Sequence, residues 1–221
     1  MASAVAGYPL TFDVEPQLHD RDRLTSFFRI ILAIPHLLLV GGPAFVFPGF
    51  SFSWAFGDDL IVSIGSFSNG VIGVVAGVVA FISWFAIVFT GRQPTGLWEL
   101  THFYLRWRAR AVAYTGLFRD DYPPFGDQPY PVSFDVTSPP VERNRLTVGL
   151  RIILGIPHFI VLFFLGVAFF VTTVIAWLAI LVNREYPQGL YTFGVGVTRW
   201  SLRVESYMLL MHDEYPPFSL D

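Results

Sequence analysis

The chain has 221 residues, of which 53% are hydrophobic, 17% aromatic and only 14% charged, with a mean hydropathy of +0.54 and a formal net charge of −3. This composition excludes an ordinary soluble domain and predicts a protein that lies in a lipid bilayer. The absence of cysteine excludes disulfides, thiolate nucleophiles and cysteine-bound iron–sulfur clusters. All fourteen basic residues are arginine, which is typical of a GC-rich bacterial genome or of selection for phosphate-binding guanidinium groups.

The first element in chain order, residues 8–15, alternates apolar and polar side chains and predicts a short strand. Its sequence, Tyr-Pro-Leu-Thr-Phe-Asp-Val, returns 122 residues later as Tyr-Pro-Val-Ser-Phe-Asp-Val at residues 130–136. The next block, Arg-Ile-Ile-Leu-Ala-Ile-Pro-His at residues 29–36, returns at the same offset with one change at residues 151–158. Repetition at a fixed offset indicates a duplicated unit, with both strands expected at the membrane surface.

The ends of the two units also match, but at an offset of 93: Tyr-Pro-Pro-Phe stands at residues 122–125 and again at 215–218. The difference, 122 − 93 = 29 residues, is an insertion in the first unit. We place it in the Gly-, Pro-, Phe- and Ser-rich residues 41–70, and expect an outer loop that contacts the outer leaflet or a partner protein. The predicted domains are therefore a first membrane repeat, residues 1–126, and a second, residues 127–221.

Each unit is predicted to contain two apolar helices, at residues 24–40 and 71–89 in the first unit and at 146–165 and 167–182 in the second. At about 1.5 Å per residue, such segments just cross a hydrocarbon layer of about 30 Å. The fold class is thus an α-helical integral membrane protein of two helical-hairpin repeats, with about four membrane helices. Only Gly166 is available as a turn in the second pair, so a re-entrant hairpin that does not cross fully remains the alternative.

Arginines precede the first and third apolar segments and follow the second and fourth, and the inserted loop has none. The positive-inside rule therefore predicts a multi-pass membrane protein with both termini and the middle linker in the cytoplasm and residues 41–70 outside. Two crossings per unit return the chain to its starting side, so we expect parallel repeats related by an axis along the membrane normal. No cleaved signal peptide is visible in residues 1–7, so the first segment is expected to direct insertion.

Each unit closes with an amphipathic segment, residues 97–118 and 190–211, which combines aromatic side chains with arginines. Such a segment is typical of a helix at the cytoplasmic membrane surface, with arginines on lipid phosphates, or of a helix packed on its own protein, and both interpretations stay open. The candidate headgroup-binding residues, including one arginine of each first apolar segment, are Arg29, Arg106, Arg110, Arg151, Arg199 and Arg203.

One side of the first apolar helix in each unit carries small and polar residues. This seam consists of Ser26, Arg29, Ala33 and His36 in the first unit and Val148, Arg151, Gly155 and His158 in the second. Arginine costs roughly 2.5–3.5 kcal/mol in mid-membrane lipid, so we expect each seam to face protein and the two seams to meet near the pseudo-twofold axis.

His36 and His158 are candidate cofactor ligands, because paired histidines on facing helices can hold a haem iron or another metal. The alternative, which the Pro-His adjacency favours, is that each histidine bonds a carbonyl left unpaired by Pro35 or Pro157. We expect neutral histidines, no metal and no cofactor.

The sequence contains no phosphate-binding glycine loop, nucleophile elbow, zinc-protease motif or nucleic-acid module, so no catalytic residue is assigned and no nucleic-acid partner is expected. We predict a non-enzymatic accessory or scaffold subunit of a larger membrane complex, or a homo-oligomer, with membrane lipids and other membrane subunits or itself as partners. The alternative is a protein that binds or transports lipids through anionic headgroups, or, less favoured, one that binds haem or metal through its paired histidines.

Three repeated motifs carry a resemblance to a known family: the Tyr-Pro-x-x-Phe-Asp-Val opening, the Arg-x-x-x-x-x-Pro-His segment and the terminal Tyr-Pro-Pro-Phe. They resemble the bacterial membrane family catalogued as domain of unknown function 4389, here present twice. The resemblance implies a small multi-pass bacterial membrane protein and supplies no catalytic residues. The chain departs from a single-copy pattern by the duplication and by the inserted loop.

Overall fold

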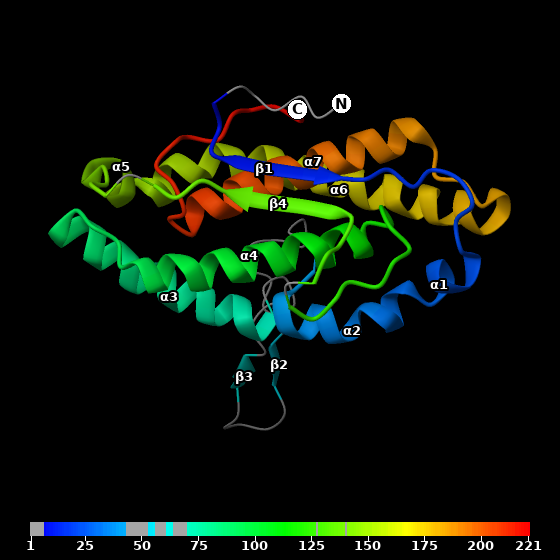
Figure 1. Ribbon diagram of the computed structural model, residues 1–221, viewed down its shortest axis with the longest axis horizontal. Helices are drawn as coiled ribbons and strands as arrows, with labels where there is room; N and C mark the ends of the chain where they lie inside the picture. Colours follow the sequence, from blue (N-terminus) through cyan, green and yellow to red (C-terminus); the bar gives the residue numbers. More distant parts are fainter. Residues whose placement is uncertain (1–6, 43–52, 56–60, 64–69, 127, 140) are drawn as a thin grey trace.

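The computed structural model describes residues 7–42, 53–55, 61–63, 70–126, 128–139 and 141–221 (Figure 1). The elements in chain order are β1 (Leu10–Val14), α1 (Arg23–Phe27), α2 (Arg29–Val40), β2 (Ser53–Ala55), β3 (Ile61–Ser63), α3 (Gly70–Thr90), α4 (Thr95–Thr115), β4 (Val132–Val136), α5 (Arg145–Gly149), α6 (Arg151–Asn183) and α7 (Gln188–Met208). Most of the predicted outer loop, residues 41–70, lies outside the described residues, apart from the antiparallel pair β2 and β3 and the residues at its two ends. Its proposed contacts therefore stay a prediction.

The two predicted strands are confirmed, and they pair with each other. β1 and β4 form an antiparallel ribbon in which Phe12 lies opposite Phe134, its own equivalent in the other repeat. A pseudo-twofold axis therefore passes between these two phenylalanines, perpendicular to the strands. In both strands the apolar residues are buried and the alternate residues exposed, as the period of two predicts.

The closing helices α4 and α7 lie beneath this ribbon, in contact with each other and each with one strand of it. Their middle residues are almost completely buried. Of the two open interpretations of these amphipathic segments, the structure shows the helix packed on its own protein. α2 and α3 flank α4, and α6 flanks α7 (Figure 1).

α6 is a single helix of 33 residues, so the turn predicted at Gly166 is wrong. A glycine inside a helix costs about 1 kcal/mol, whereas a break would leave backbone groups of two helix ends without partners in apolar surroundings. In the first repeat, α2 and α3 follow one another along the opposite flank and correspond to α6 with the insertion between them (Figure 1). Gly166 itself is buried on the side of α6 that faces the protein.

Among the residues that the structure describes, two helices, α3 and α6, are long and apolar enough to cross a membrane, while α2 has only 12 residues. The prediction that each repeat crosses the membrane with two helices is therefore wrong for the second repeat, which has the single helix α6. Because the ribbon strands are antiparallel, α6 also runs opposite to α2 and α3 across the axis (Figure 1). The pseudo-twofold axis is thus perpendicular to these helices. If the axis lay along the membrane normal, the helices would lie in the membrane plane, so parallel repeats are incompatible with four crossing helices.

The repeats are interlocked at both ends of the molecule. α1 of the first repeat packs on α6 of the second, and α5 of the second packs on α3 of the first. Equivalent tryptophans form a hydrogen bond in each contact: Trp177 Nε1 donates to the Ser26 carbonyl and Trp84 Nε1 to the Val148 carbonyl, each at 3.0 Å. The hydrophobic core therefore contains residues of both repeats.

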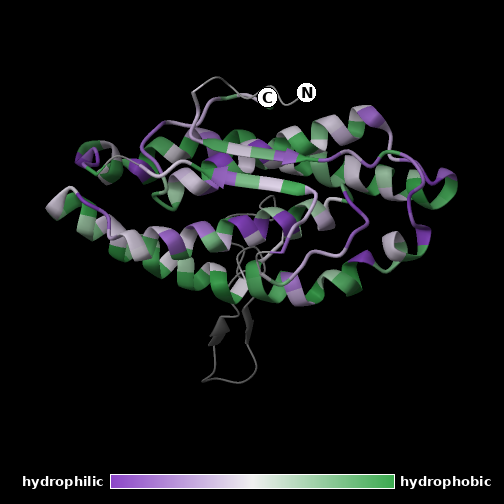
Figure 2. Cartoon of the chain, in the orientation of Figure 1, coloured by the Kyte–Doolittle hydropathy of each residue, from purple (hydrophilic) through white to green (hydrophobic). Residues whose placement is uncertain are grey.

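The outward faces of α2, α3 and α6 are apolar and exposed (Figure 2). Ile30 on α2 is 78% exposed, Ile152 on α6 70% and Phe81 on α3 64%. The outer side of the β1–β4 ribbon instead carries polar residues, among them Asp13 and Asp135. The molecule thus combines uncharged helical flanks with a polar ribbon.

Candidate functional site

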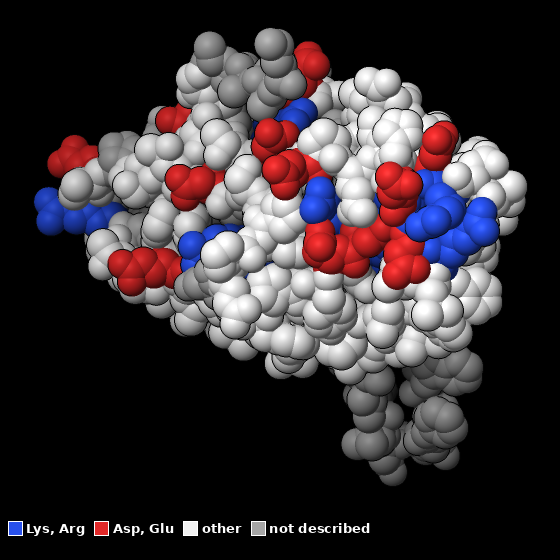
Figure 3. All heavy atoms as spheres, turned by 45° about the vertical axis from the view of Figure 1, so that its right-hand side comes forward, with Lys and Arg blue, Asp and Glu red and all other residues white. Residues whose placement is uncertain are grey.

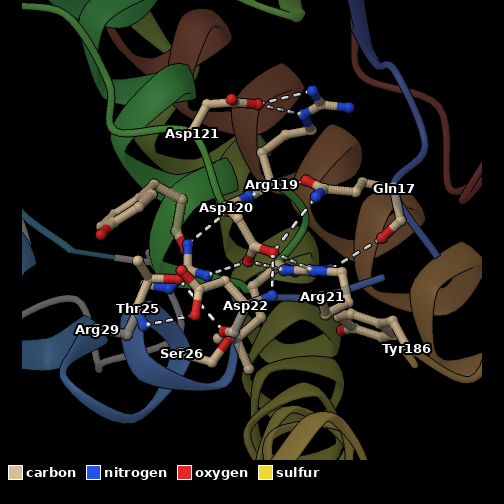
Figure 4. Close-up of polar contacts among 12 residues, drawn as sticks. Gln17, Arg21, Asp22, Thr25, Ser26, Arg29, Arg119, Asp120, Asp121 and Tyr186 are labelled. Atoms are coloured by element: carbon tan, nitrogen blue, oxygen red, sulfur yellow. Dashed lines mark hydrogen bonds and ion pairs between the residues drawn. The ribbon is translucent and has the colours of Figure 1, made fainter. Parts of the chain in front are cut away.

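The first candidate site is a buried ionic cluster around Asp120, which follows α4 (Figure 4). Arg21 donates two hydrogen bonds to this carboxylate, from Nε at 3.0 Å and from Nη2 at 2.7 Å. Arg29 Nη2 donates to the same carboxylate at 2.6 Å, and the Asp22 N–H at 2.9 Å. Asp22 also caps α1, because its own carboxylate accepts from the first backbone N–H groups of that helix. Asp120 therefore fixes the start of α1 and α2 against the end of α4.

A second cluster around Asp213 reproduces the first at the equivalent positions. Arg143 donates to Asp213 Oδ1 from Nε at 2.9 Å and from Nη2 at 2.7 Å, and Arg151 Nη2 donates at 3.1 Å. The Asn144 N–H donates to Oδ2 at 3.1 Å, and the Asn144 side chain caps α5. Each cluster thus joins two guanidinium groups to one carboxylate.

The arginines of the clusters also close the C-terminal ends of α4 and α7. Arg21 Nη2 donates to the Leu117 carbonyl at 2.7 Å, and the equivalent Arg143 Nη2 to the Leu210 carbonyl at 3.1 Å. Carbonyls at a helix C-terminus have no partner in the helix and carry its negative end, so cations stabilise them. Both leucines have positive φ, 64° each, where the chain leaves the helix.

Burial alone would raise the pKa of Asp120 and of Asp213. The hydrogen bonds and charges of the neighbouring arginines, with the backbone N–H of residue 22 or 144, outweigh burial and lower the pKa of both carboxyls below their ordinary value. Both groups are therefore carboxylates at neutral pH. The clusters are built to hold the fold, because each arginine and each aspartate already has partners within the protein.

Five of the six predicted headgroup-binding arginines donate to main-chain carbonyls of the protein itself, and Arg106 is half-buried on α4. The carbonyl partners are those of Tyr114 and Arg119 for Arg29, Tyr207 for Arg151, Gly126 for Arg110, Phe12 and Leu220 for Arg199, and Ser219 for Arg203. Binding of lipid headgroups by these residues stays a prediction.

The predicted histidines lie in two equivalent aromatic cages. His36 Nδ1 accepts a hydrogen bond from Trp107 Nε1 at 3.0 Å. Phe125 stacks on the imidazole with ring centroids 4.6 Å apart, and Tyr122 lies tilted at 5.0 Å. The Tyr-Pro-Pro-Phe motif thus supplies the wall of the cage.

The second cage has the same construction. His158 Nδ1 accepts from Trp200 Nε1 at 3.2 Å, Phe218 stacks at 4.1 Å and Tyr215 lies tilted at 4.8 Å. Indole N–H is a donor only, so each Nδ1 is unprotonated and each imidazole is neutral with its proton on Nε2. Repetition of the arrangement explains why the tryptophan and the Tyr-Pro-Pro-Phe motif recur with the histidine.

Burial of the seams is confirmed, but two expectations about them are wrong. The seams do not meet at the pseudo-axis, because α4 and α7 occupy it and each seam packs on one of them. His36 and His158 therefore lie in separate cages, one against α4 and one against α7. The histidines also do not bond proline-freed carbonyls: these belong to Ile31 and Ile153, four residues before each proline, and neither is a hydrogen-bond partner of His36 or His158 in the described part of the chain.

Replacing Trp107 by phenylalanine should lower the free energy of unfolding by about 1–3 kcal/mol, because it leaves the buried His36 Nδ1 without a donor. Trp200→Phe should have a matching effect through His158. Denaturant unfolding in detergent, followed by circular dichroism, measures both. Phe103→Leu on the exposed side of α4 serves as the control, and equal stability of all three variants would contradict a role for the indole donors.

A third buried histidine, His212, joins the two ends of the chain and was not singled out from the sequence. Its Nδ1 donates to the Glu214 carbonyl at 3.2 Å, which leaves Nε2 to accept from the Tyr8 hydroxyl at 3.4 Å. Burial, with the nearby charge of Arg151, lowers the pKa of His212 to about 3. The neutral ring therefore holds residue 8 against the segment that follows α7.

An apolar cavity of about 480 Å³ lies between α1–α2 and the second half of α6. The last residue of α4 and the two that follow border it, and its polar lining residues are Ser26, Arg29, Thr115 and Thr173. The sequence placed Ser26 and Arg29 on a protein-facing seam but gave no sign of a cavity, because that depends on side chains of α6. Among the residues that the structure describes, no group of three or more His, Cys, Asp or Glu side chains is arranged to hold a metal.

These features define a pseudo-twofold helical protein in which two ionic clusters and two histidine cages hold interlocked repeats beneath a two-stranded ribbon. The chain belongs to the family described as Domain of unknown function (DUF4389), whose model matches residues 64–126 and 145–219. One match falls in each repeat, which confirms both the family and its tandem duplication. Searches of curated proteins and of solved structures found no match.

Proposed function

We propose that the protein is a non-enzymatic protein of the bacterial plasma membrane, embedded through the outward faces of α2, α3 and α6. The observation that carries this proposal is the exposed apolar surface of these helices: residues 152–183 of α6 include no charged side chain. Acidic and basic side chains instead lie together in groups on the surface, next to broad areas without charged residues (Figure 3). Such segregation supports a position of the helical flanks in lipid and of the ribbon with its linkers toward water.

Within the membrane we propose the role of an accessory or scaffold subunit, or of a self-associating protein. The pseudo-twofold axis gives the chain two related apolar flanks, α2–α3 and α6, so one molecule offers similar surfaces to neighbours on both sides. Partners in this proposal are membrane lipids together with other membrane subunits or further copies. Native mass spectrometry in mild detergent tests it, and a strictly monomeric protein without associated subunits would contradict the scaffold role.

Both chain ends are proposed to lie on the cytoplasmic side. Tyr8 packs edge-on against His212, with ring centroids 5.2 Å apart, so the N-terminal strand and the C-terminal segment are held on the same side of the molecule. The arginine-rich linkers support the assignment of that side to the cytoplasm by the positive-inside rule.

Membrane placement predicts that the protein floats with liposomes after alkaline carbonate washing and that a cysteine replacing Ser133, on the exposed face of β4, reacts from the cytoplasmic side. An impermeant thiol reagent should label Ser133→Cys in inverted vesicles and not in intact cells. Val78→Cys on the lipid-facing side of α3 is the control and should stay unlabelled in both. Release by carbonate would refute the membrane placement, and labelling of Ser133→Cys in intact cells would refute its sidedness.

Lipid binding is a second candidate function, which the apolar cavity between α2 and α6 favours. Its form differs from headgroup binding by the six predicted arginines, because the cavity lies between helices and its lining residues are mostly apolar.

A further inference from the structure

The cavity between α2 and α6 opens toward the surface that we place in lipid. Three of its lining residues, Ile30, Phe170 and Val174, are also exposed on the outward faces of these helices, Phe170 to 65%. An apolar molecule can therefore pass from the bilayer into the cavity sideways, without crossing a polar layer. Its inner wall is formed by Thr115, where α4 ends, and by the two residues that follow.

Three buried polar atoms of residues that line this cavity have no hydrogen-bond partner in the protein. They are Ser26 Oγ, Arg29 Nε and Thr173 Oγ1. Arg29 uses Nη1 on two main-chain carbonyls and Nη2 on Asp120, so Nε is its one nitrogen without a partner. An unpaired buried polar group costs about 1–3 kcal/mol, and all three groups can donate to an acceptor. An anionic oxygen of a bound molecule is the kind of acceptor that would satisfy such donors.

The equivalent place in the second repeat keeps one unpaired donor, Arg151 Nε, but it lacks the two hydroxyl groups and the space. Val148 stands where the first repeat has Ser26, and Ala80 stands where α6 has Thr173. Thr115 corresponds to Met208, whose Sδ lies so close to Gly155 that a Cβ there would be 2.9 Å from it. The duplication thus produced two related positions, of which the first is hollow and bordered by two unpaired hydroxyl groups, whereas a methionine occupies the second.

We propose that this cavity binds one long-chain fatty acid, with its hydrocarbon chain between α2 and α6 and its carboxylate at Ser26, Thr173 and Arg29 Nε. An apolar cavity of about 150 Å³ holds the six carbons of benzene, so by the same ratio a cavity of this volume holds on the order of twenty carbons. That is the size of one acyl chain, whereas a diacyl phospholipid is about twice as large. The proposal rests on the membrane placement proposed above.

The decisive variant gives the first repeat the residues that the second repeat has at two equivalent positions. Ala33→Gly combined with Thr115→Met should fill the cavity as Met208 fills its counterpart. Val78→Met, on the exposed face of α3 and away from the cavity, is the matched control. Each protein is reconstituted in phosphatidylcholine vesicles with a diazirine-bearing palmitate, irradiated, and its labelled residues are identified by mass spectrometry.

The expected result is saturable labelling of cavity residues such as Leu37 and Val174, competed by unlabelled palmitate and reduced about tenfold or more in the double variant but not in Val78→Met. Ser26→Val with Thr173→Ala, which keeps the cavity, should weaken competition by palmitate and leave competition by its methyl ester unchanged. Unsaturable labelling spread over the exposed faces of α3 and α6, or equal labelling of all variants, would overturn the site.

Two further outcomes separate this proposal from the membrane placement. A protein that floats with vesicles but lacks saturable labelling overturns the fatty-acid site alone, while one that does not float overturns both. Recovery of a diacyl phospholipid in the cavity, detected by native mass spectrometry and displaced only by the Ala33→Gly, Thr115→Met variant, would overturn the assignment to a fatty acid.

Discussion

Replacing Asp120 by alanine should lower the free energy of unfolding by about 3–5 kcal/mol, because two buried guanidinium groups lose their shared carboxylate. Asp213→Ala should have a similar effect through the equivalent cluster. Denaturant unfolding in detergent, followed by circular dichroism, measures both changes. The matched control is Asp121→Ala: this neighbour is 56% exposed, and its pair with Arg119 is expected to contribute less than about 1 kcal/mol.

The same clusters predict a loss of stability in acid. The folded pKa of Asp120 and of Asp213 lies below the ordinary value of 3.8, so their stabilising contribution is complete above that pH and is lost as the pH falls through the folded pKa. The Asp120→Ala variant should therefore show a shallower decline in stability below about pH 4 than the native protein. Parallel acid-unfolding curves for the two proteins would contradict the assignment.

A second large effect is expected at the contact between α4 and α7. Arg108 is 1% exposed and donates from Nε to Glu205 at 2.7 Å and from Nη1 to the Val40 carbonyl at 2.7 Å. Glu205→Ala should cost about 3–5 kcal/mol, because it leaves this buried guanidinium without its carboxylate. This ion pair has no counterpart in the pseudo-symmetry, since residues 201 and 112 at the equivalent places are serine and valine.

The double change Arg108→Met with Glu205→Leu tests the cause, since replacement of a buried ion pair by apolar side chains is often neutral. It should recover most of the stability lost in Glu205→Ala. Glu99→Ala, at an exposed position of α4, is the control and should change stability by no more than about 0.5 kcal/mol. A double variant less stable than Glu205→Ala would show that Arg108 acts through contacts other than its charge.

Much of the candidate site was visible in the sequence as single residues without their partners. The repeated Arg-x-x-x-x-x-Pro-His segment predicted correctly that Arg29 and His36 are buried, because a helix exposes a polar stripe to lipid only at high cost. The carboxylate that neutralises Arg29 lies 91 residues away along the chain, and the indole that bonds His36 lies 71 residues away. Nothing in local spacing specifies such distant contacts.

The sequence by itself determined the duplication, the two strands, the apolar helices, the family and the inward direction of the seams, because these follow from local periodicity and from the cost of polar groups in lipid. Only the tertiary structure decided that the strands pair across the repeats, that α4 and α7 occupy the axis, and that α6 continues through Gly166. It also decided that one repeat leaves a cavity where Met208 fills the other. These outcomes depend on which surfaces pack together. Packing in turn depends on how well the shapes of side chains far apart in the chain fit one another.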